Sequence, residues 1–227
     1  MHSLWREKRP GNRPPRGVQH ASLVGGAGTL PATSKFHSMT YPLITPRLSI
    51  APLGEKDAAE FVAYRRDPDV ARWQGWDPTY SEAEAAKLIA SQPSAEVPHS
   101  GGWLQLAIHD RGSGKLQGDV AVHRLADVSD TFEIGVTLAP ASQHQGIAIE
   151  AVNRLLHYLF TTVNAHRVIA TCDARNTPVA RLLLSVGMRQ ESSQIDVEFF
   201  KHEWVTLDGY AILQAEHAAQ IKDEVQL

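Results

Sequence analysis

Residues 132–160, "FEIGVTLAPASQHQGIAIEAVNRLLHYLF", decide the fold of this chain. The stretch opens with a short apolar run, 131–138 once Thr131 is included, which is typical of a buried strand. It closes with apolar residues at helical spacing, which predict a long helix over 146–163. Between these segments, "QHQGIA" at 143–148 offers two amides, a histidine and two very small side chains. The stretch therefore predicts a strand that leads through a tight loop into a helix.

The loop at 143–148 has the features of an anion-binding site. The N–H groups in the first turn of a helix have no partner within the helix, and they lie at the positive end of its dipole. Gly146 and Ala148 are small, so an anion can approach the backbone closely, and Gln143 adds a neutral donor. An ordinary helix cap has similar residues, and the Gly-x-Gly-x-x-Gly pattern of dinucleotide-binding proteins is absent. The loop by itself leaves both interpretations open.

The flanking sequence predicts a mixed α+β order, in which helices follow particular strands. Ser81 and Glu84 form a capping box that starts one helix, and Gly187 ends another. The predicted strands cover 43–53, 103–110, 116–125, 131–138 and 167–174, with two closing strands or a bent hairpin over 198–213. The predicted helices cover 54–67, a segment that follows Ser81, 146–163 and 177–186. This order differs from that of a doubly wound parallel sheet and from that of a sandwich.

The length of 227 residues fits one domain with extensions. Residues 1–38 are rich in Pro, Gly and Arg, lack apolar periodicity and carry six basic side chains against one acidic one. We expect 1–38 to be a disordered basic extension, the domain to span 39–215 and a C-terminal tail to span 216–227. The extension is either an upstream or non-native start, with Met39 as the functional one, or a solvated basic tail. Its prolines disfavour a transit peptide.

Composition argues against several classes of function. No apolar run reaches the ~18 residues of a membrane span, so we expect no membrane contact. The formal net charge is −3, and the residues after 38, with sixteen basic and twenty-four acidic side chains, carry −8, which argues against nucleic-acid binding. The eleven histidines show no metal-ligand spacing, so we expect no metal. The single cysteine, Cys172, agrees with a reducing compartment, and we expect a cytoplasmic protein.

Several segments resemble the GCN5-related N-acetyltransferases, the GNAT superfamily. "QHQGIA" is similar to the acyl-CoA signature Gln-x-x-Gly-x-Ala of that family, and it lies between a strand and an apolar helix as the signature does. Further segments resemble, in the same order along the chain, the RimJ/RimL-like branch that acetylates ribosomal-protein N-termini. These segments are "ITPRLSIAPL", "LQGDVAVH", "FEIGVTLAP", "DARNTPVARLLLSVGM" and "EWVTLDGYAIL". The resemblance runs from about residue 43 to about residue 214.

The resemblance implies a fold and a coenzyme. The central sheet of the family is mostly antiparallel, has helices on both faces and splays into a V between its fourth and fifth strands, at a bulge. Acetyl-CoA would enter this opening as the acyl donor, with its pantetheine arm along the backbone of Val136, Thr137 and Leu138. The signature loop would hold the pyrophosphate, and Asn176 would hydrogen-bond the arm, although Asn176 also suits a helix N-cap. The loop residues are Gln143, His144, Gln145, Gly146, Ile147 and Ala148.

Glu133 lies just before the thioester-binding segment, where the family often has a carboxylate. It is a candidate general base that takes the proton of the amine, directly or through a water. Its alternatives are to anchor the substrate's ammonium or simply to point at solvent. The sequence departs from the family at Val179, where many relatives have a serine that protonates the leaving thiolate. Valine cannot donate a proton, so this proton would come from water or from another group.

The acceptor is less well defined by the sequence. Trp73, Trp76 and Tyr80 cluster between the first two predicted helices, a segment that commonly forms a wall of the acceptor pocket in the family. Packing in the core and contact at an interface are the alternative roles for these side chains. The implied function is transfer of an acetyl group by direct attack of a primary amine, either a protein N-terminus or a small molecule. The alternatives are a non-catalytic acyl-CoA sensor and an acyltransferase with a different acyl-CoA donor. We expect a monomer or a homodimer.

Overall fold

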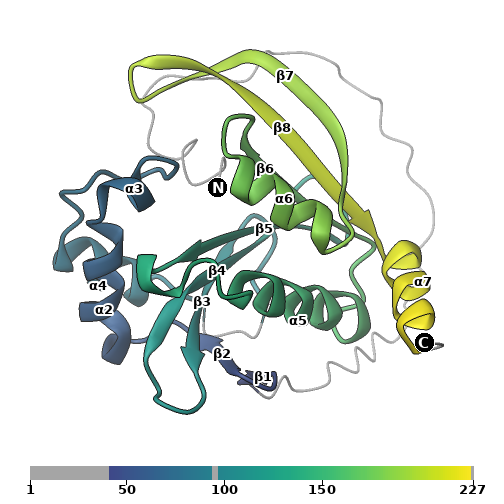
Figure 1. Ribbon diagram of the computed structural model, residues 1–227, viewed down its shortest axis with the longest axis horizontal. Helices are drawn as coiled ribbons and strands as arrows, with labels where there is room; N and C mark the ends of the chain where they lie inside the picture. The colour runs from purple at the N-terminus through teal and green to yellow at the C-terminus, as the bar shows by residue number, and fades with distance from the viewer. Residues whose placement is uncertain (1–40, 94–96, 226–227) are drawn as a thin grey trace, which may run out of the picture.

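The computed structural model describes residues 41–93 and 97–225. The predicted basic extension, 1–38, lies outside the described residues. The remaining chain forms one eight-stranded sheet with the order β1-β2-β3-β4-β5-β6-β8-β7, in which only the β5–β6 pair is parallel (Figure 1). The strands are β1 Leu43–Ile44, β2 Leu48–Pro52, β3 Trp103–Asp110, β4 Leu116–Arg124, β5 Thr131–Leu138, β6 Arg167–Asp173, β7 Arg189–Phe200 and β8 Glu203–Leu213. The α+β class and the mostly antiparallel sheet expected from the sequence are confirmed.

Helices cover both faces of the sheet. Successive side chains of its strands point to opposite faces, and each face has an apolar core that helices cover. Leu104, Leu106 and Ile108 of β3 belong to the larger core, together with Leu155 of α5. Ala107 faces the opposite side, where a smaller core contains residues of α2 and α4. The helices are α2 Ala58–Arg65, α3 Pro68–Ala71, α4 Glu82–Ala90, α5 Ile147–Thr161, α6 Thr177–Ser185 and α7 Gln214–Val225, with short 3-10 turns η1 Glu55–Asp57 and η2 Pro140–Ser142.

The sheet opens between β5 and β6. These two strands pair only from Thr131–Arg167 to Glu133–Ile169, although β5 continues to Leu138 and β6 to Asp173. The V-shaped splay expected between the fourth and fifth long strands is therefore present. The implied bulge is not, because the β4–β5 ladder runs from Arg124–Phe132 to Gly118–Leu138 without a shift of register. The opening arises where pairing with β6 stops.

Three boundaries differ from those that the sequence predicts. The first strand, 43–53, is divided into β1 and β2 by a turn that begins at Thr45. Strand β7 begins at Arg189 rather than at residue 198. The sequence did not predict its first half, because the residues there are polar and exposed, lack apolar alternation and are held in a strand by pairing with β8. The predicted tail, 216–227, lies largely in helix α7.

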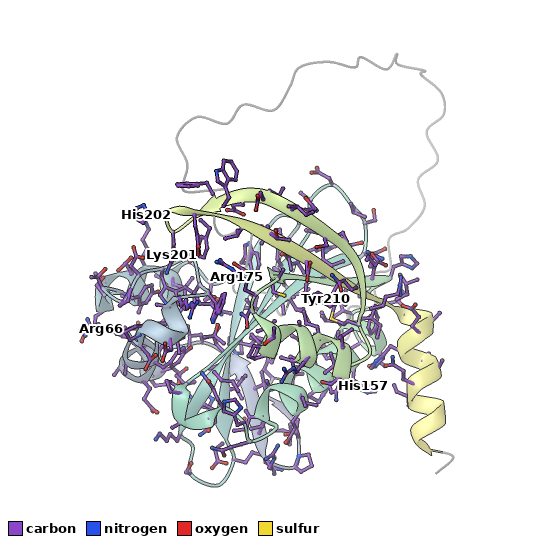
Figure 2. All side chains as sticks on the ribbon, turned by 45° about the horizontal axis from the view of Figure 1, so that its top comes forward. Arg66, His157, Arg175, Lys201, His202 and Tyr210 are labelled. Atoms are coloured by element: carbon purple, nitrogen blue, oxygen red, sulfur yellow. The ribbon has the colours of Figure 1, made fainter. Side chains whose placement is uncertain are left out.

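Strands β7 and β8 form a long hairpin that arches above β6 and α6 at the top of the view in Figure 1. Lys201 and His202 form its tip, shown in Figure 2, and both have left-handed backbone conformations, with φ of 46° and 72°. The inner side of this hairpin faces the opening of the sheet and carries residues of the candidate site.

Strands β4 and β5 approach each other closely at Gly118, beside the splay. Its φ is 153°, and a Cβ placed there would collide with the carbonyl oxygen of Thr137. Gly114 also has a positive φ, 72°, but a Cβ there would meet nothing within 4 Å. We expect Gly118→Ala to lower the free energy of unfolding by about 3 kcal/mol, against about 1 kcal/mol for Gly114→Ala, because only the first adds a backbone clash. Urea unfolding followed by circular dichroism measures the free energy of unfolding of both variants. Equal losses would contradict the inference that the backbone of β5 leaves no room for a side chain at Gly118.

Candidate functional site

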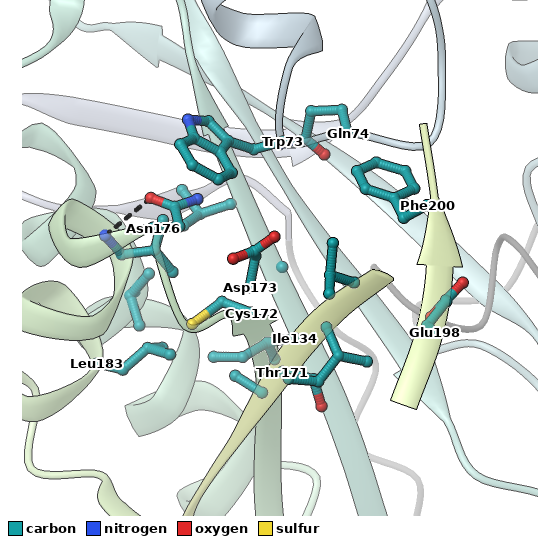
Figure 3. Close-up of a pocket in the computed structure, with 17 residues that line it drawn as sticks. Trp73, Gln74, Ile134, Thr171, Cys172, Asp173, Asn176, Leu183, Glu198 and Phe200 are labelled. Carbon is teal, nitrogen blue, oxygen red and sulfur yellow. Dashed lines mark hydrogen bonds between the residues drawn. The ribbon is translucent and has the colours of Figure 1, made fainter. Parts of the chain in front are cut away.

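Two cavities meet where β5 and β6 diverge. The larger has a volume of about 690 Å³ and the smaller about 90 Å³. Five residues line both cavities, so the two form one continuous site: Trp73, Gln74, Val136, Asn176 and Val179. Figure 3 shows the smaller cavity, with Trp73, Gln74 and Phe200 along the upper part of the view, Asn176 at the left and Leu183 and Thr171 below.

The N-terminus of α5 lies at the larger cavity. His144 and Gly146 both have left-handed backbone conformations, with φ of 60° and 73°, and Gly146 is the N-cap of α5. In the part of the chain that the structure describes, the N–H groups of residues 144–149 donate to no protein acceptor. An array of unused N–H groups at the positive end of a helix suits an anion with several oxygens. Of the residues predicted for the coenzyme, those lining this cavity are Val136, Thr137, Leu138, Gln143, His144, Gly146, Ile147, Ala148 and Asn176.

Arg47 and Glu150 hold this loop in place. The Arg47 guanidinium donates to the carbonyl of Gln145 at 2.9 Å and to Glu150 at 2.6 Å, and Thr45 donates to the same carboxylate at 2.6 Å. Burial opposes ionisation of Glu150, but the hydrogen bonds from Thr45 and Arg47 outweigh it and lower the pKa of that carboxyl. Gln145 does not line the cavity, because its side chain turns back to donate to the carbonyl of Ala141 at 2.6 Å. Its contribution to the loop is thus through the backbone.

The two cavities differ in charge. Arg72 and Arg181 line the larger one together with one acidic residue, Asp69, and the Arg72 guanidinium lies 4.7 Å from the centre of the Trp73 ring. Asp173 and Glu198 line the smaller one, and within the described residues no basic side chain lines it, although Asp173 accepts from Arg175 at 2.7 Å. The larger cavity therefore suits a polyanion, whereas the smaller one suits a cation.

The smaller cavity is closed by the β7–β8 hairpin. Phe200, Val205 and Leu207 of the hairpin line the cavity together with Trp73. At the hairpin tip, the Lys201 ammonium donates to the carbonyls of Ala71 at 2.7 Å and Trp76 at 2.9 Å. The hairpin is thereby fixed to the segment between α3 and α4 that carries Trp73.

Asn176 is placed for both of the roles that the sequence suggests, helix capping and contact with a ligand. Its side chain accepts from the Val179 N–H at 3.4 Å, which makes it the N-cap of α6. It is also 8% exposed and lines both cavities. Capping is therefore observed, and the side chain lies within reach of a ligand in the site. Val179 adds only an apolar surface to the same wall.

Glu133 is buried at the vertex of the splay, in the last pair between β5 and β6. It is 5% exposed, which excludes the alternative that it points at solvent. One carboxylate oxygen lies 3.4 Å from Nδ1 of His123, whose ring stacks on Trp103 with a centroid distance of 4.5 Å. Glu133 itself lines neither cavity, while its neighbours Ile134 and Val136 do. Successive side chains of a strand point to opposite faces of the sheet, so the Glu133 side chain does not share the face of Ile134 and Val136.

Trp76 and Tyr80 lie in the smaller core rather than in either cavity. The guanidinium of Arg65 lies 3.7 Å from the Trp76 ring centre and 4.9 Å from that of Tyr80, and Phe61 completes the cage at 3.9 Å. Trp76 also donates to the carbonyl of Arg65 at 3.1 Å. Of the three predicted acceptor residues, only Trp73 reaches the site, because the other two pack around a buried cation.

Cys172 lines the smaller cavity as a buried, free thiol. Burial, followed by the negative charges of Asp208 and Asp173, raises the pKa of this thiol to about 11. A thiol with that pKa is almost entirely protonated at neutral pH, and the thiol form is a poor nucleophile. This environment disfavours an acyl relay through Cys172.

The sequence did not reveal several residues of the site. Arg72 carried no local signal, Arg181 was not considered, and Gln74 follows Trp73, whose aromatic ring was the feature that the prediction used. Glu198 and Phe200 belong to a strand whose course depends on pairing with β8. A search for basic residues one helical turn beyond the Asn176 cap would have found Arg181.

Two further findings bear on the type of protein. Among residues 41–93 and 97–225, no group of three or more His, Cys, Asp or Glu side chains is placed to hold a metal ion. In the same part of the chain, no helix has both the length and the apolar character needed to cross a membrane.

Comparison with known proteins agrees with this geometry. The family model described as "Acetyltransferase (GNAT) domain" matches residues 47–189. The uncharacterized N-acetyltransferase p20 of Bacillus licheniformis is 26% identical over 176 residues, which cover 78% of this chain and 98% of p20. A GNAT-family acetyltransferase from Bacillus anthracis superposes with a TM-score of 0.66 at 27% identity, covering 74% of this chain and 96% of that one.

A more distant structure shares the fold. The spermidine N-acetyltransferase of Vibrio cholerae, solved in complex with CoA and spermine, has a TM-score of 0.67 at 19% identity, covering 77% of this chain and 99% of that one. The family match extends over the splayed strands, the loop before α5 and helix α6. The chain belongs to the GNAT family of acetyltransferases and is an N-acetyltransferase.

Proposed function

We propose that the enzyme transfers an acetyl group from acetyl-CoA to a primary amine by direct attack. The observation that carries this proposal is the junction of two cavities at the splay between β5 and β6, of which one is lined by two arginines and the other by two carboxylates. The larger cavity has arginines and unused backbone N–H groups, which suit the coenzyme's phosphates. The smaller cavity has carboxylates and aromatic rings, which suit an amine.

The chain's own backbone would hold the donor. The pyrophosphate would accept hydrogen bonds from the first turn of α5, with Arg72 and Arg181 supplying positive charge. The pantetheine arm would lie along Val136, Thr137 and Leu138, where β5 no longer pairs with β6 and its edge is free for another extended chain. A backbone N–H on this edge would stabilise the negative charge that develops on the thioester carbonyl.

The proton of the attacking amine would pass to Glu133. Because Glu133 lines neither cavity, we assign the transfer to an intervening water. His123 orients the carboxylate and lies within reach to share the proton. The departing thiolate would take its proton from water, since Val179 cannot donate one. The raised pKa of Cys172 favours direct attack over a covalent acyl-enzyme.

The acceptor contact falls to Trp73, not to Trp76 or Tyr80, because only Trp73 lines the site. The Vibrio cholerae structure contains spermine, so polyamines are a reasonable first class of acceptor. The alternative acceptor is a protein N-terminus, which the resemblance to the RimJ/RimL-like branch supports. We propose that the enzyme belongs to that branch and acts in the cytoplasm. The free thiol of Cys172 is consistent with a reducing compartment.

A thiol-release assay tests the function directly. The full chain would be incubated with acetyl-CoA and, in separate reactions, spermidine, an aminoglycoside and short peptides with free N-termini. We expect release of free CoA that depends on the amine, with the acetylated amine found by mass spectrometry. Propionyl-CoA and succinyl-CoA in parallel reactions determine the donor preference. Tight binding of acetyl-CoA without release for any amine would point to a sensor and overturn the proposal.

Substitution of Ala148 separates coenzyme binding from helix stability. A glutamate in the first turn of α5 interacts favourably with the helix dipole, so Ala148→Glu should unfold at the same temperature as Ala148→Gln or slightly above it. The same charge repels the pyrophosphate, so acetyl-CoA affinity should fall at least ~10-fold relative to the size-matched Gln variant. Isothermal calorimetry and thermal unfolding without ligand measure both quantities. Equal affinities in the two variants would remove the phosphates from this helix terminus.

Glu133→Gln tests the general base. The substitution keeps the size of the side chain and removes its ability to accept the proton as a carboxylate, so kcat should fall ~100-fold or more. The dissociation constant for acetyl-CoA should stay within about twofold of the wild-type value, because Glu133 lines neither cavity. Steady-state kinetics over pH 6–9 and calorimetry give the two values. An unchanged kcat would exclude Glu133 from the proton transfer.

A further inference from the structure

We propose that the side-chain oxygen of Gln74 binds the amine of the acceptor, and that the smaller cavity selects a cationic amine head carried on a short apolar chain. This inference rests on the proposed function and adds the residue that recognises the acceptor. Gln74 lies at the junction of the two cavities, where the amine must meet the thioester.

The first observation is an unused acceptor. Gln74 is 6% exposed, and its Oε1 atom is buried without a hydrogen-bond partner among the described residues. A buried amide oxygen in that state is destabilising, and native proteins seldom keep one unless a ligand or water completes it. Because Gln74 lines both cavities, the ligand that completes it is one that occupies the site.

The second observation is the chemistry around this oxygen. An amide oxygen accepts a hydrogen bond from a protonated or neutral amine, but it offers nothing to a carboxylate. Asp173 and Glu198 are the acidic side chains that line the same cavity, and Asp173 is held by Arg175 at 2.7 Å. The aromatic rings of Trp73 and Phe200 line it as well (Figure 3). Aromatic faces and carboxylates together stabilise a positive charge.

The rest of the cavity wall limits the size and polarity of the group that carries the amine. Ile134, Val205 and Leu207 are apolar, and the cavity volume is about 90 Å³. Such a space admits an aminomethyl or aminopropyl group but not a second charged group beside the first. The acceptor therefore enters one amine at a time, with its remaining bulk outside.

The third observation is the way that Gln74 is held. Its backbone N–H donates to the carbonyl of Ala71 at 2.9 Å, and the same carbonyl accepts from Lys201. Lys201 also binds the carbonyl of Trp76, so one ammonium holds the chain on both sides of residues 73–74. Lys201 is thus a positioning residue, which aligns Gln74 while it fixes the hairpin that closes the cavity.

The test compares Gln74→Met with Gln190→Met, an exposed glutamine of β7, as the matched control. With the amine that wild-type enzyme acetylates fastest among spermidine, the aminoglycoside and the peptides, we expect kcat/KM for that amine to fall about tenfold or more in Gln74→Met. The dissociation constant of acetyl-CoA should stay within about twofold, and the control should match wild type in both. The ligand-free Tm of Gln74→Met should equal or exceed that of wild type, because the variant loses an unsatisfied buried oxygen.

The possible outcomes are distinct. Unchanged amine kinetics in Gln74→Met would overturn the inference while leaving the acetyltransferase proposal intact. A fall in Tm together with lost acetyl-CoA binding would show a structural role and would also overturn it. Gln74→Glu keeps an oxygen acceptor, so recovery of amine kcat/KM to within about threefold of wild type would support the inference. Absence of turnover by wild type with every amine would defeat the proposed function itself.

Discussion

The parallel pairing of β5 with β6 stops after Glu133 and Ile169, and the rest of the site depends on that interruption. A parallel pair normally continues along the shared length of its strands, because each lost ladder bond leaves buried N–H and C=O groups without partners. Here both strands continue past the last pair and diverge, so in the described part of the chain no strand pairs with this edge of β5 from Val136 to Leu138, although the Gln143 side chain donates to the Leu138 carbonyl at 3.4 Å. An extended ligand can satisfy that edge as an added strand would. The interruption thus creates a binding site without a separate domain.

Rigid supports on either side keep the opening from collapsing. The ion pair and hydrogen bonds between Arg47 and Glu150 fix the loop before α5, and Lys201 fixes the hairpin on the other side. Inside the opening, Thr137 and Gln74 each keep a buried oxygen without a partner in the described residues. Unsatisfied groups of this kind reduce the stability of the free protein, and these two belong to residues that line the cavities. Such groups are expected where binding, rather than folding, has set the side chains.

The aromatic cluster before α4 shows how residue type alone can mislead. Trp73, Trp76 and Tyr80 are close in sequence, yet only Trp73 enters the site. The other two surround Arg65, a buried guanidinium whose Nε has no hydrogen-bond partner in the described residues. Burying such a cation is unfavourable unless ring faces or charges surround it, and this need explains the aromatics. A ligand pocket and a cage around a buried cation both contain aromatic residues, so composition alone cannot predict which of the two a given aromatic residue belongs to.

The amino-acid sequence alone predicts most of the long helices and strands and several of their ends. The Ser81–Glu84 capping box, the Asn176 cap and the small residues before α5 act over one helical turn, so each is visible in a short segment. It also determined most of the coenzyme loop, because a helix N-terminus and the glycine that opens it are neighbours in the chain. Three facts became visible only in the folded chain: the partner of Glu133, the aromatic that reaches the site, and the supply of Glu198 and Phe200 by β7. The first and third depend on the pairing of neighbouring strands, and the second on contacts such as that of Lys201 with Ala71, 130 residues apart, none of which leaves a periodic pattern in the segments concerned.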